Sequence, residues 1–182
     1  MPATETREEA LVHALGSEPR RPAAFRELLR LGSDAVPAIR RGLAHPQDLV
    51  REQCCKLLDH LLVTEALGDL IAMLDDPSPR VRVAAIHALA CDRCKSDSCR
   101  PDQAVVLPRG IRLLSQDPDA HVRNFAAELV GLSVHTHEEA ADALVRARDN
   151  DPSPAVRKKA GWYAPGGSIH RRTAPRPARR PR

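Results

Sequence analysis

The sequence predicts an all-α fold, a right-handed α-solenoid of about four helix pairs with an N-terminal helical cap, on two observations. A phrase with a proline four residues ahead of a Val-Arg pair occurs four times, starting at His45, Asp76, Asp117 and Asp151. The starts lie 31, 41 and 34 residues apart, and repeats of this period are typical of stacked helix pairs. Aromatic residues make up only 2% of the chain, so Leu, Val, Ile and Ala must form the core, which suits closely packed helices.

The cap is expected over residues 1–32. Residues 6–15 predict a short helix that ends at Gly16, and residues 23–31 predict a second helix that ends at Gly32. Glycine commonly terminates helices because it tolerates the left-handed backbone conformation found there. A connection rich in proline and arginine joins the two helices.

Four helix pairs are expected over residues 33–165. Ser33 and Thr64 are natural N-caps, and Ser78 with Pro79 supplies a cap and a first-turn proline. The expected pairs are 33–44 with 48–62, 64–74 with 79–91, 104–115 with 119–132, and 137–148 with 154–163.

Aligning the second helices on the valines of the repeated phrase predicts the environment of each position. Cys54 and Cys55 fall in columns of small or apolar residues, so both are expected in the core rather than at a ligand site. The next column mixes charged and aromatic residues, which indicates a position facing solvent. That column holds Lys56, His87, Glu128 and Trp162.

The arginines that follow these valines form a column of their own. A repeated arginine at the start of each second helix is expected to bind aspartates or backbone carbonyls of the adjacent inter-helix turns, which is a structural role. The four arginines of this predicted ladder are Arg51, Arg82, Arg123 and Arg157.

Paired short helices and the Asp-Pro-x-x-x-Val-Arg opening resemble HEAT repeats, in particular the short variety of phycobilisome-lyase-type and many bacterial HEAT-like proteins. The similarity covers about residues 33–165. It implies a solenoid whose inner helices line a concave face. It is specific for fold and not for function, because the family includes scaffolds, lyase-like chaperones and a few DNA glycosylases.

An insert at residues 91–101 accounts for the longest of the three spacings. It carries a Cys-x2-Cys-x4-Cys pattern formed by Cys91, Cys94 and Cys99. His87 lies one helical turn before Cys91, and three thiolates with one imidazole are the donor set of a closed structural Zn2+ site. One zinc ion is therefore the predicted cofactor, and His60 of the preceding repeat is the alternative fourth ligand. An iron–sulfur cluster, inert or redox-active thiols, and a disulfide are the other interpretations.

The charge of the chain is concentrated at its C-terminal end. The formal net charge is +4, but residues 168–182 contain six arginines and no acidic residue, so residues 1–167 carry about −2. Residues 166–182 are expected to be a disordered, basic Pro/Arg-rich tail, since they have too little apolar surface to offset chain entropy.

The only Trp and the only Tyr, Trp162 and Tyr163, lie close to this tail. One interpretation is that they cover the open end of the last repeat. The other is that they form, with nearby cations, a stacking and phosphate-binding platform for nucleic acid. The residues of that platform are Lys158, Lys159, Trp162, Arg171 and Arg172.

Function follows mainly from what the motifs exclude. No apolar run approaches the ~20 residues that span a bilayer, and the N-terminus is acidic, which predicts a cytoplasmic protein without membrane contact. No phosphate-binding glycine loop, metalloprotease helix or recognisable nucleophile occurs, so no catalytic residue is predicted. The expected function is a non-catalytic scaffold or adaptor that binds a protein partner through its concave face. A protein that binds nucleic acid weakly through the tail and the Trp162 region is the alternative, and a HEAT-like DNA-repair enzyme is a more distant one.

Overall fold

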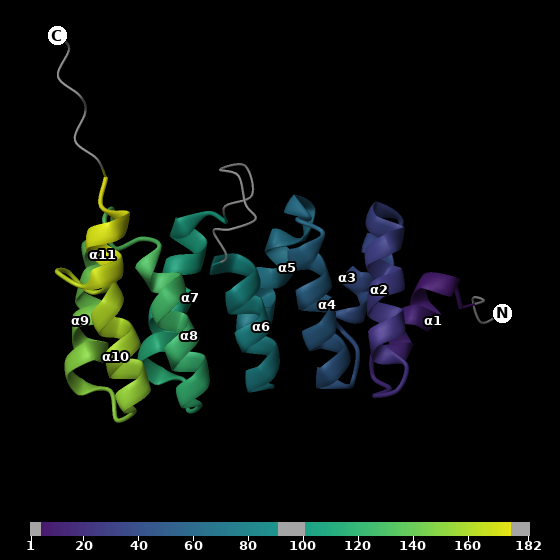
Figure 1. Cartoon of the computed structure of the whole chain (residues 1–182), viewed down its shortest axis with the longest axis horizontal. Helices are drawn as coiled ribbons and strands as arrows, with labels where there is room; N and C mark the ends of the chain where they lie inside the picture. Colours follow the sequence, from purple (N-terminus) through teal and green to yellow (C-terminus); the bar gives the residue numbers. More distant parts are fainter. Residues whose placement is uncertain (1–4, 91–100, 176–182) are drawn as a thin grey trace, which may run out of the picture. The chain divides into compact units, whose positions relative to one another are not determined.

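The computed structural model describes residues 5–90 and 101–175, which form helices and their connections without any β-strand. Figure 1 shows the order of the helices along the chain. The chain divides into two compact units, Met1–Asp102 and Gln103–Arg182. The division follows the cysteine-bearing insert, of which residues 91–100 lie outside the described residues.

The first unit begins with the predicted cap, which consists of α1 (Arg7–Ala14) and α2 (Arg21–Leu31). Thr6 caps α1 by accepting a hydrogen bond from the Glu9 N–H, and the Glu9 carboxylate accepts one from the Thr6 N–H. Gly32 ends α2 at φ 60° and ψ −127°, a conformation that favours glycine. Both helices lie within two residues of their predicted positions.

Two helix pairs complete the described part of this unit: α3 (Val36–Gly42) with α4 (Asp48–His60), and α5 (Leu67–Ala72) with α6 (Pro79–Ala90). The first helices of the pairs are shorter than predicted, because 3₁₀ turns occupy Gly32–Ala35, Thr64–Ala66 and Met73–Asp75. Pro37 accounts for the first of these turns, since it lacks the N–H that an α-helix would direct to the Ser33 carbonyl. The predicted N-caps at Ser33 and Thr64 are wrong: neither caps a helix, and the two 3₁₀ turns there have no side-chain cap bond.

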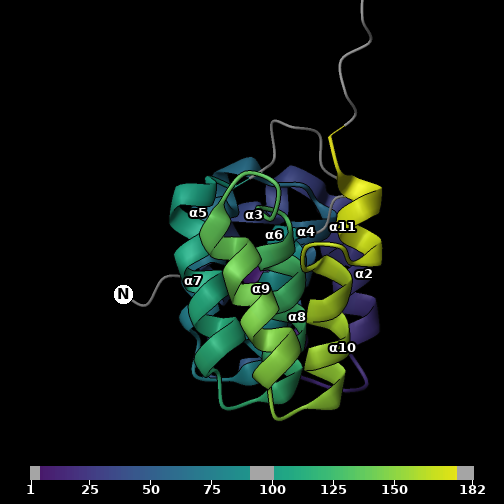
Figure 2. The same cartoon turned by 90° about the vertical axis from the view of Figure 1, so that its left-hand side faces the viewer.

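The second unit contains α7 (Gln103–Gln116), α8 (Ala120–Gly131), α9 (Glu138–Asn150), α10 (Pro154–Tyr163) and α11 (Ser168–Thr173). Figure 2 shows α7 and α9 in one layer and α8 and α10 in the other, so the two pairs stack. Asp119 caps α8 by accepting hydrogen bonds from the N–H groups of His121 and Val122. The pairs match their predicted ranges within two residues.

The core is aliphatic, as the composition predicts. Cys54, Ala85, Ala126 and Ala160 share one register position on the second helices, and all four are fully buried. Leu58, Leu89 and Val130 on the same helices are also buried. Gly131 allows close approach of two helices, because a Cβ there would overlap with the ring of Tyr163 on α10.

The prediction that residues 166–182 are disordered is wrong for residues 168–173, which form α11. Its backbone starts with a hydrogen bond from the Arg171 N–H to the Gly167 carbonyl, at 3.0 Å. The His170 ring packs on the ring of His135, 4.4 Å between centroids, and the Thr173 hydroxyl lies 3.0 Å from His135 Nε2. These contacts with the α8–α9 connection supply stabilisation that composition alone does not reveal. Residues 176–182 lie outside the described residues.

Candidate interaction surface

The predicted arginine ladder lies at the turns between helices. In the first unit, Arg51 donates to both carboxylate oxygens of Asp76, from Nε at 2.7 Å and from Nη2 at 2.9 Å, and its Nη1 donates to the carbonyls of His45 and Pro46. In the second unit, Arg123 binds Asp151 in the same way, and its Nη1 donates to the carbonyls of Asp117 and Pro118.

The other two arginines of the ladder also bind their own turns. Arg82 donates from Nη1 to the carbonyls of Asp76 and Pro77, and Arg157 donates to those of Asp151 and Pro152. Burial alone would raise the pKa of Asp151, but hydrogen bonds from Arg123 and from the Ser153 N–H hold it below its ordinary value. These arginines are structural ties, because their guanidinium groups are already engaged with the turns.

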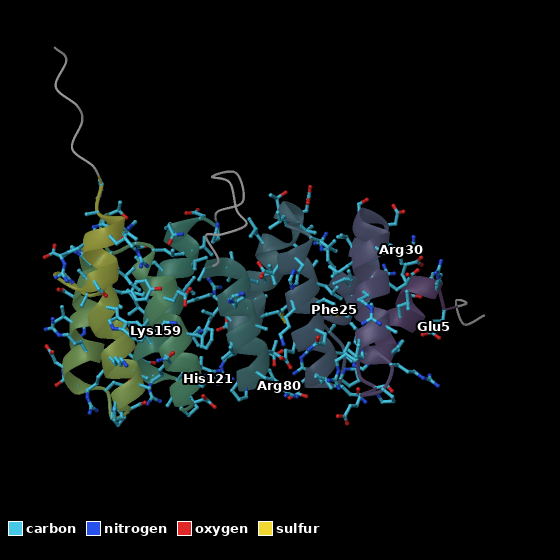
Figure 3. All side chains as sticks on the ribbon, viewed as in Figure 1. Glu5, Phe25, Arg30, Arg80, His121 and Lys159 are labelled. Carbon is cyan, nitrogen blue, oxygen red and sulfur yellow. The ribbon has the colours of Figure 1, made fainter. Side chains whose placement is uncertain are left out.

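The exposed side of the second helices in the first unit carries compensated charges. Glu52 pairs with Lys56 at 2.6 Å and with Arg80 at 3.2 Å. Figure 3 shows Arg80 at the lower end of α6, and half of its side chain is exposed. The column that mixes charged and aromatic residues faces outward as predicted, since Lys56 is partly exposed and His87 is exposed.

The described ligands of the predicted zinc site have other neighbours. His87 Nε2 lies 3.7 Å from the Asp59 carboxylate, and the His60 ring packs edge-on against the Phe25 ring, with 5.9 Å between centroids. The three cysteines of the insert lie outside the described residues, so the zinc site stays a prediction. Within residues 5–90 and 101–175, no group of three or more potential ligands could hold a metal ion.

Cys54 and Cys55 are buried free thiols, in agreement with the predicted core role. Burial raises the pKa of both, that of Cys55 to about 12, which keeps the thiols protonated near neutral pH. Neither is therefore placed to act as a thiolate ligand or nucleophile.

The exposed side of the second unit is built around Phe125 on α8. The His121 ring contacts the Phe125 ring edge-on, at 4.9 Å between centroids, and Lys159 Nζ lies 5.0 Å from the centre of the same ring. Lys159 also forms an ion pair with Glu128 at 2.8 Å. Figure 3 shows His121 and Lys159 on the same side of α8 and α10.

The two C-terminal aromatic residues have different environments. Tyr163 packs against Gly131 and helps to join α10 to α8, whereas Trp162 is 40% exposed. Lys158, one turn before Trp162, places its ammonium 5.6 Å from the centre of the Trp162 ring. Of the predicted platform, Lys158 and Trp162 therefore lie together. Lys159 instead contacts Glu128 and Phe125. Arg171 and Arg172 lie on α11.

A pocket of about 410 Å³ lies on the other layer of the second unit, between the ends of α7 and α9. Leu114, Ala143 and Ala147 form its apolar part, and Arg146 and Asn150 lie among its polar residues. No motif in the sequence points to this pocket. Phe125 was not among the predicted surface residues, although Phe125 and Lys159 occupy the same register position in successive repeats.

The fold agrees with what known proteins show. The family model described as HEAT repeats matches residues 2–90, 36–104 and 69–164. The chain belongs to the HEAT-repeat family. Within the described residues, no helix of this HEAT-repeat protein is long and apolar enough to cross a membrane.

Solved structures support the α-solenoid fold of this HEAT-repeat protein. It is similar to a chain in the complex of CpcE and CpcF of phycocyanin lyase from Nostoc sp. PCC7120, with a TM-score of 0.66 and 22% identity over 84% of this chain and 95% of that one. It is also similar to a designed armadillo repeat protein in complex with the peptide (KR)4, with a TM-score of 0.58 and 19% identity over 87% and 80% of the two chains. A comparison with curated proteins finds no match.

Proposed function

We propose that the protein is a non-catalytic scaffold that binds a protein partner through the exposed side of its second helices, the side that HEAT repeats are expected to make concave. The observation that supports this most directly is the difference between the two sides of these helices. Small residues pack inward, while aromatic and charged side chains, including the exposed Trp162, face outward. Trp, Tyr and Arg are the residues on which protein interfaces most often depend.

Nucleic-acid binding has less support from the same residues. Two of the five cations and aromatics predicted for it, Lys158 and Trp162, do lie together. Lys159, however, is already paired with Glu128, and the two units contain acidic residues on most of their helices. We therefore rank a protein partner ahead of a nucleic acid, and we expect the scaffold to act in the cytoplasm.

Site-specific photo-cross-linking tests the proposed binding side. A photoreactive amino acid replaces His87, His121 or Trp162 on second helices, and, as matched controls, Glu65, Asp142 or Arg146 on the first-helix side. We expect cross-links to one protein species from the first set and little from the second, followed by a stoichiometric complex of the two purified proteins. Equal cross-linking from both sets would overturn the proposal.

A further inference from the structure

The second unit carries a surface whose charge points to one class of partner. We propose that the exposed side of α8, α10 and α11 binds an acidic protein segment, and this rests on the protein-binding function proposed above. We call this side the basic surface. Its described residues are His121, Phe125, Lys158, Trp162, Arg171 and Arg172.

The charged residues of these three helices are almost all positive. Together α8, α10 and α11 contain six Lys or Arg residues and a single acidic residue, Glu128. By contrast, α7 and α9 together contain four arginines and four acidic residues, and α4 with α6 contain four basic and three acidic residues. Within the second unit, the excess of positive charge thus lies on α8, α10 and α11, and such an excess attracts carboxylates and orients an approaching partner.

Internal pairing leaves part of this positive charge available. Arg123 and Arg157 bind the turns, and Lys159 neutralises Glu128. Lys158 and Arg172 are exposed and form no ion pair within the described part of the chain, and Arg171 hydrogen-bonds to the Gly166 carbonyl. These three cations are the groups that carboxylates of a partner would reach.

The aromatic residues of the basic surface favour a protein segment over a nucleic acid. Stacking of a nucleobase needs an open ring face, and a lysine ammonium lies over the rings of both Phe125 and Trp162. A carboxylate can pair with Lys158 while that lysine keeps its place, and an apolar side chain can contact the exposed part of Trp162. An acidic segment with interspersed apolar residues therefore complements the surface without displacing its own contacts.

A peptide of known composition provides the first test, with the full-length protein. The probe is a 20-residue fluorescein-labelled peptide of Glu and Leu, with Leu at helical three- and four-residue spacing, and its control carries Gln in place of every Glu. We expect the acidic peptide to bind at least tenfold more tightly than the Gln peptide in fluorescence anisotropy. Raising the salt concentration should weaken its binding, because exposed ion pairs are screened. Equal binding of the two peptides would overturn the proposal.

Charge reversal localises the binding. The double substitution Lys158→Glu with Arg172→Glu should lower the affinity for the acidic peptide at least tenfold. Arg146→Glu on α9 is the matched control, because Arg146 is also an exposed arginine of the same unit, and its effect should stay below twofold. A similar loss for both variants would contradict the proposal. The proposal would also be contradicted if a 20-nucleotide oligo-dT bound more tightly than the peptide and lost that affinity in the Lys158→Glu, Arg172→Glu variant.

The two proposals can fail separately. One outcome separates them: other second-helix positions cross-link a protein partner, but the acidic peptide does not bind and the Trp162 position gives no cross-link. In that case the scaffold function stands and the partner class is wrong. If no second-helix position gives a cross-link, the function proposed above fails, whatever the peptide does.

Discussion

Arg123 on α8 holds both carboxylate oxygens of Asp151, from Nε at 2.8 Å and from Nη2 at 3.1 Å, although 28 residues separate them in the sequence. The same guanidinium donates to the carbonyls of its own turn through Nη1. One side chain thus joins the start of α8, the α7–α8 turn and the α9–α10 turn. The pair is nearly buried, with 11% of the Arg123 side chain and 6% of the Asp151 side chain exposed.

Removing one partner of this pair should cost much of the stability of the second unit. We expect Asp151→Ala to lower the free energy of unfolding by about 3 kcal/mol, because it leaves a buried guanidinium without its carboxylate. Urea denaturation followed by far-UV circular dichroism measures the change. Asp149→Ala is the control: Asp149 pairs with Arg148 in an exposed ion pair, so its loss should cost less than about 1 kcal/mol. Equal effects would mean that Arg123 does not tie the repeats.

A histidine pair should make the N-terminal cap sensitive to acid. His45 Nδ1 accepts the Gln47 N–H at 3.1 Å, so neutral His45 carries its proton on Nε2 and donates it to His13 Nδ1, at 3.1 Å. Protonating either ring places a proton where a donor already points, which breaks a hydrogen bond. Burial, the charge of His13 and that of Arg51 lower the pKa of His45 below its ordinary value of 6.5.

Because the folded pKa of His45 is lowered, protons bind the unfolded chain more readily, and the stabilisation is complete above pH 6.5 and lost as the pH falls below it. We expect His13→Leu to destabilise the protein by about 1 kcal/mol at pH 7.5 and to have almost no effect at pH 5. Urea unfolding at both pH values measures this difference. An effect of the same size at pH 5 would contradict the proposed tautomers, and His121→Gln, in the other unit, serves as the control.

Gly131 should not tolerate a side chain. A Cβ at this position overlaps with the Tyr163 ring, so we expect Gly131→Ala to push α10 from α8 and to cost about 2 kcal/mol in thermal or chemical unfolding. Gly68→Ala is the matched control, since Gly68 lies in α5 with open space around it. That change should stabilise the protein by about 0.5 kcal/mol, because alanine has the higher helix propensity. A neutral Gly131→Ala would contradict the close packing of α8 and α10.

Leu62 adopts a conformation that glycine would adopt with less strain. Its φ is 53°, and the Val63 N–H bonds back to the Leu58 carbonyl in the arrangement that commonly ends helices with a glycine. We expect Leu62→Gly to stabilise the first unit by about 0.5 kcal/mol, since the relief of strain exceeds the loss of a partly exposed side chain. Leu61→Gly, at the preceding residue with ordinary helical φ, should instead destabilise it. A lower melting temperature for Leu62→Gly would show that the Leu62 side chain matters more than its backbone.

Metal analysis tests the zinc site predicted at the insert. We expect one zinc ion per chain in untagged protein purified without chelators, measured by mass spectrometry. Cys91→Ser and Cys94→Ser should remove the metal and lower the melting temperature, whereas Cys54→Ser should leave the metal content unchanged because Cys54 is a core residue. Zinc well below one per chain would contradict the site.

The repeated phrase made most of the fold predictable, because one short motif specifies a turn, a helix start and an inter-repeat bond together. It places an aspartate in each later turn and an arginine one turn into the helix, so the partners of Arg51 and Arg123 follow from the register. The ends of the first helices were less predictable. At α3, the backbone bond that Pro37 removes leaves a 3₁₀ turn where an α-helical turn was expected. The helix α11 was missed because its stabilising contact, His170 with His135, joins residues far apart in sequence.

The candidate surface was partly visible in the same register. Phe125 and Lys159 share a column, so their contact could have been inferred from the alignment of adjacent repeats. The pairing of Lys159 with Glu128 depends on side-chain conformations that a column does not specify. For the same reason, the alignment predicted that Trp162 faces solvent but not that Lys158 lies over its ring.

The arginine–aspartate bonds between repeats all run in one direction along the sequence, from an arginine to a later aspartate. Each complete tie reaches from one repeat to an aspartate in the turn of a later one, and Arg157 ends the series with carbonyls of its own turn within the described chain. A designed repeat appended behind α10, with α11 removed and an aspartate at the matching place of its turn, would give Arg157 the partner that Arg51 and Arg123 already have. The protein could in this way be lengthened one module at a time, from its C-terminal end, with the joint supplied by a residue that is already in place.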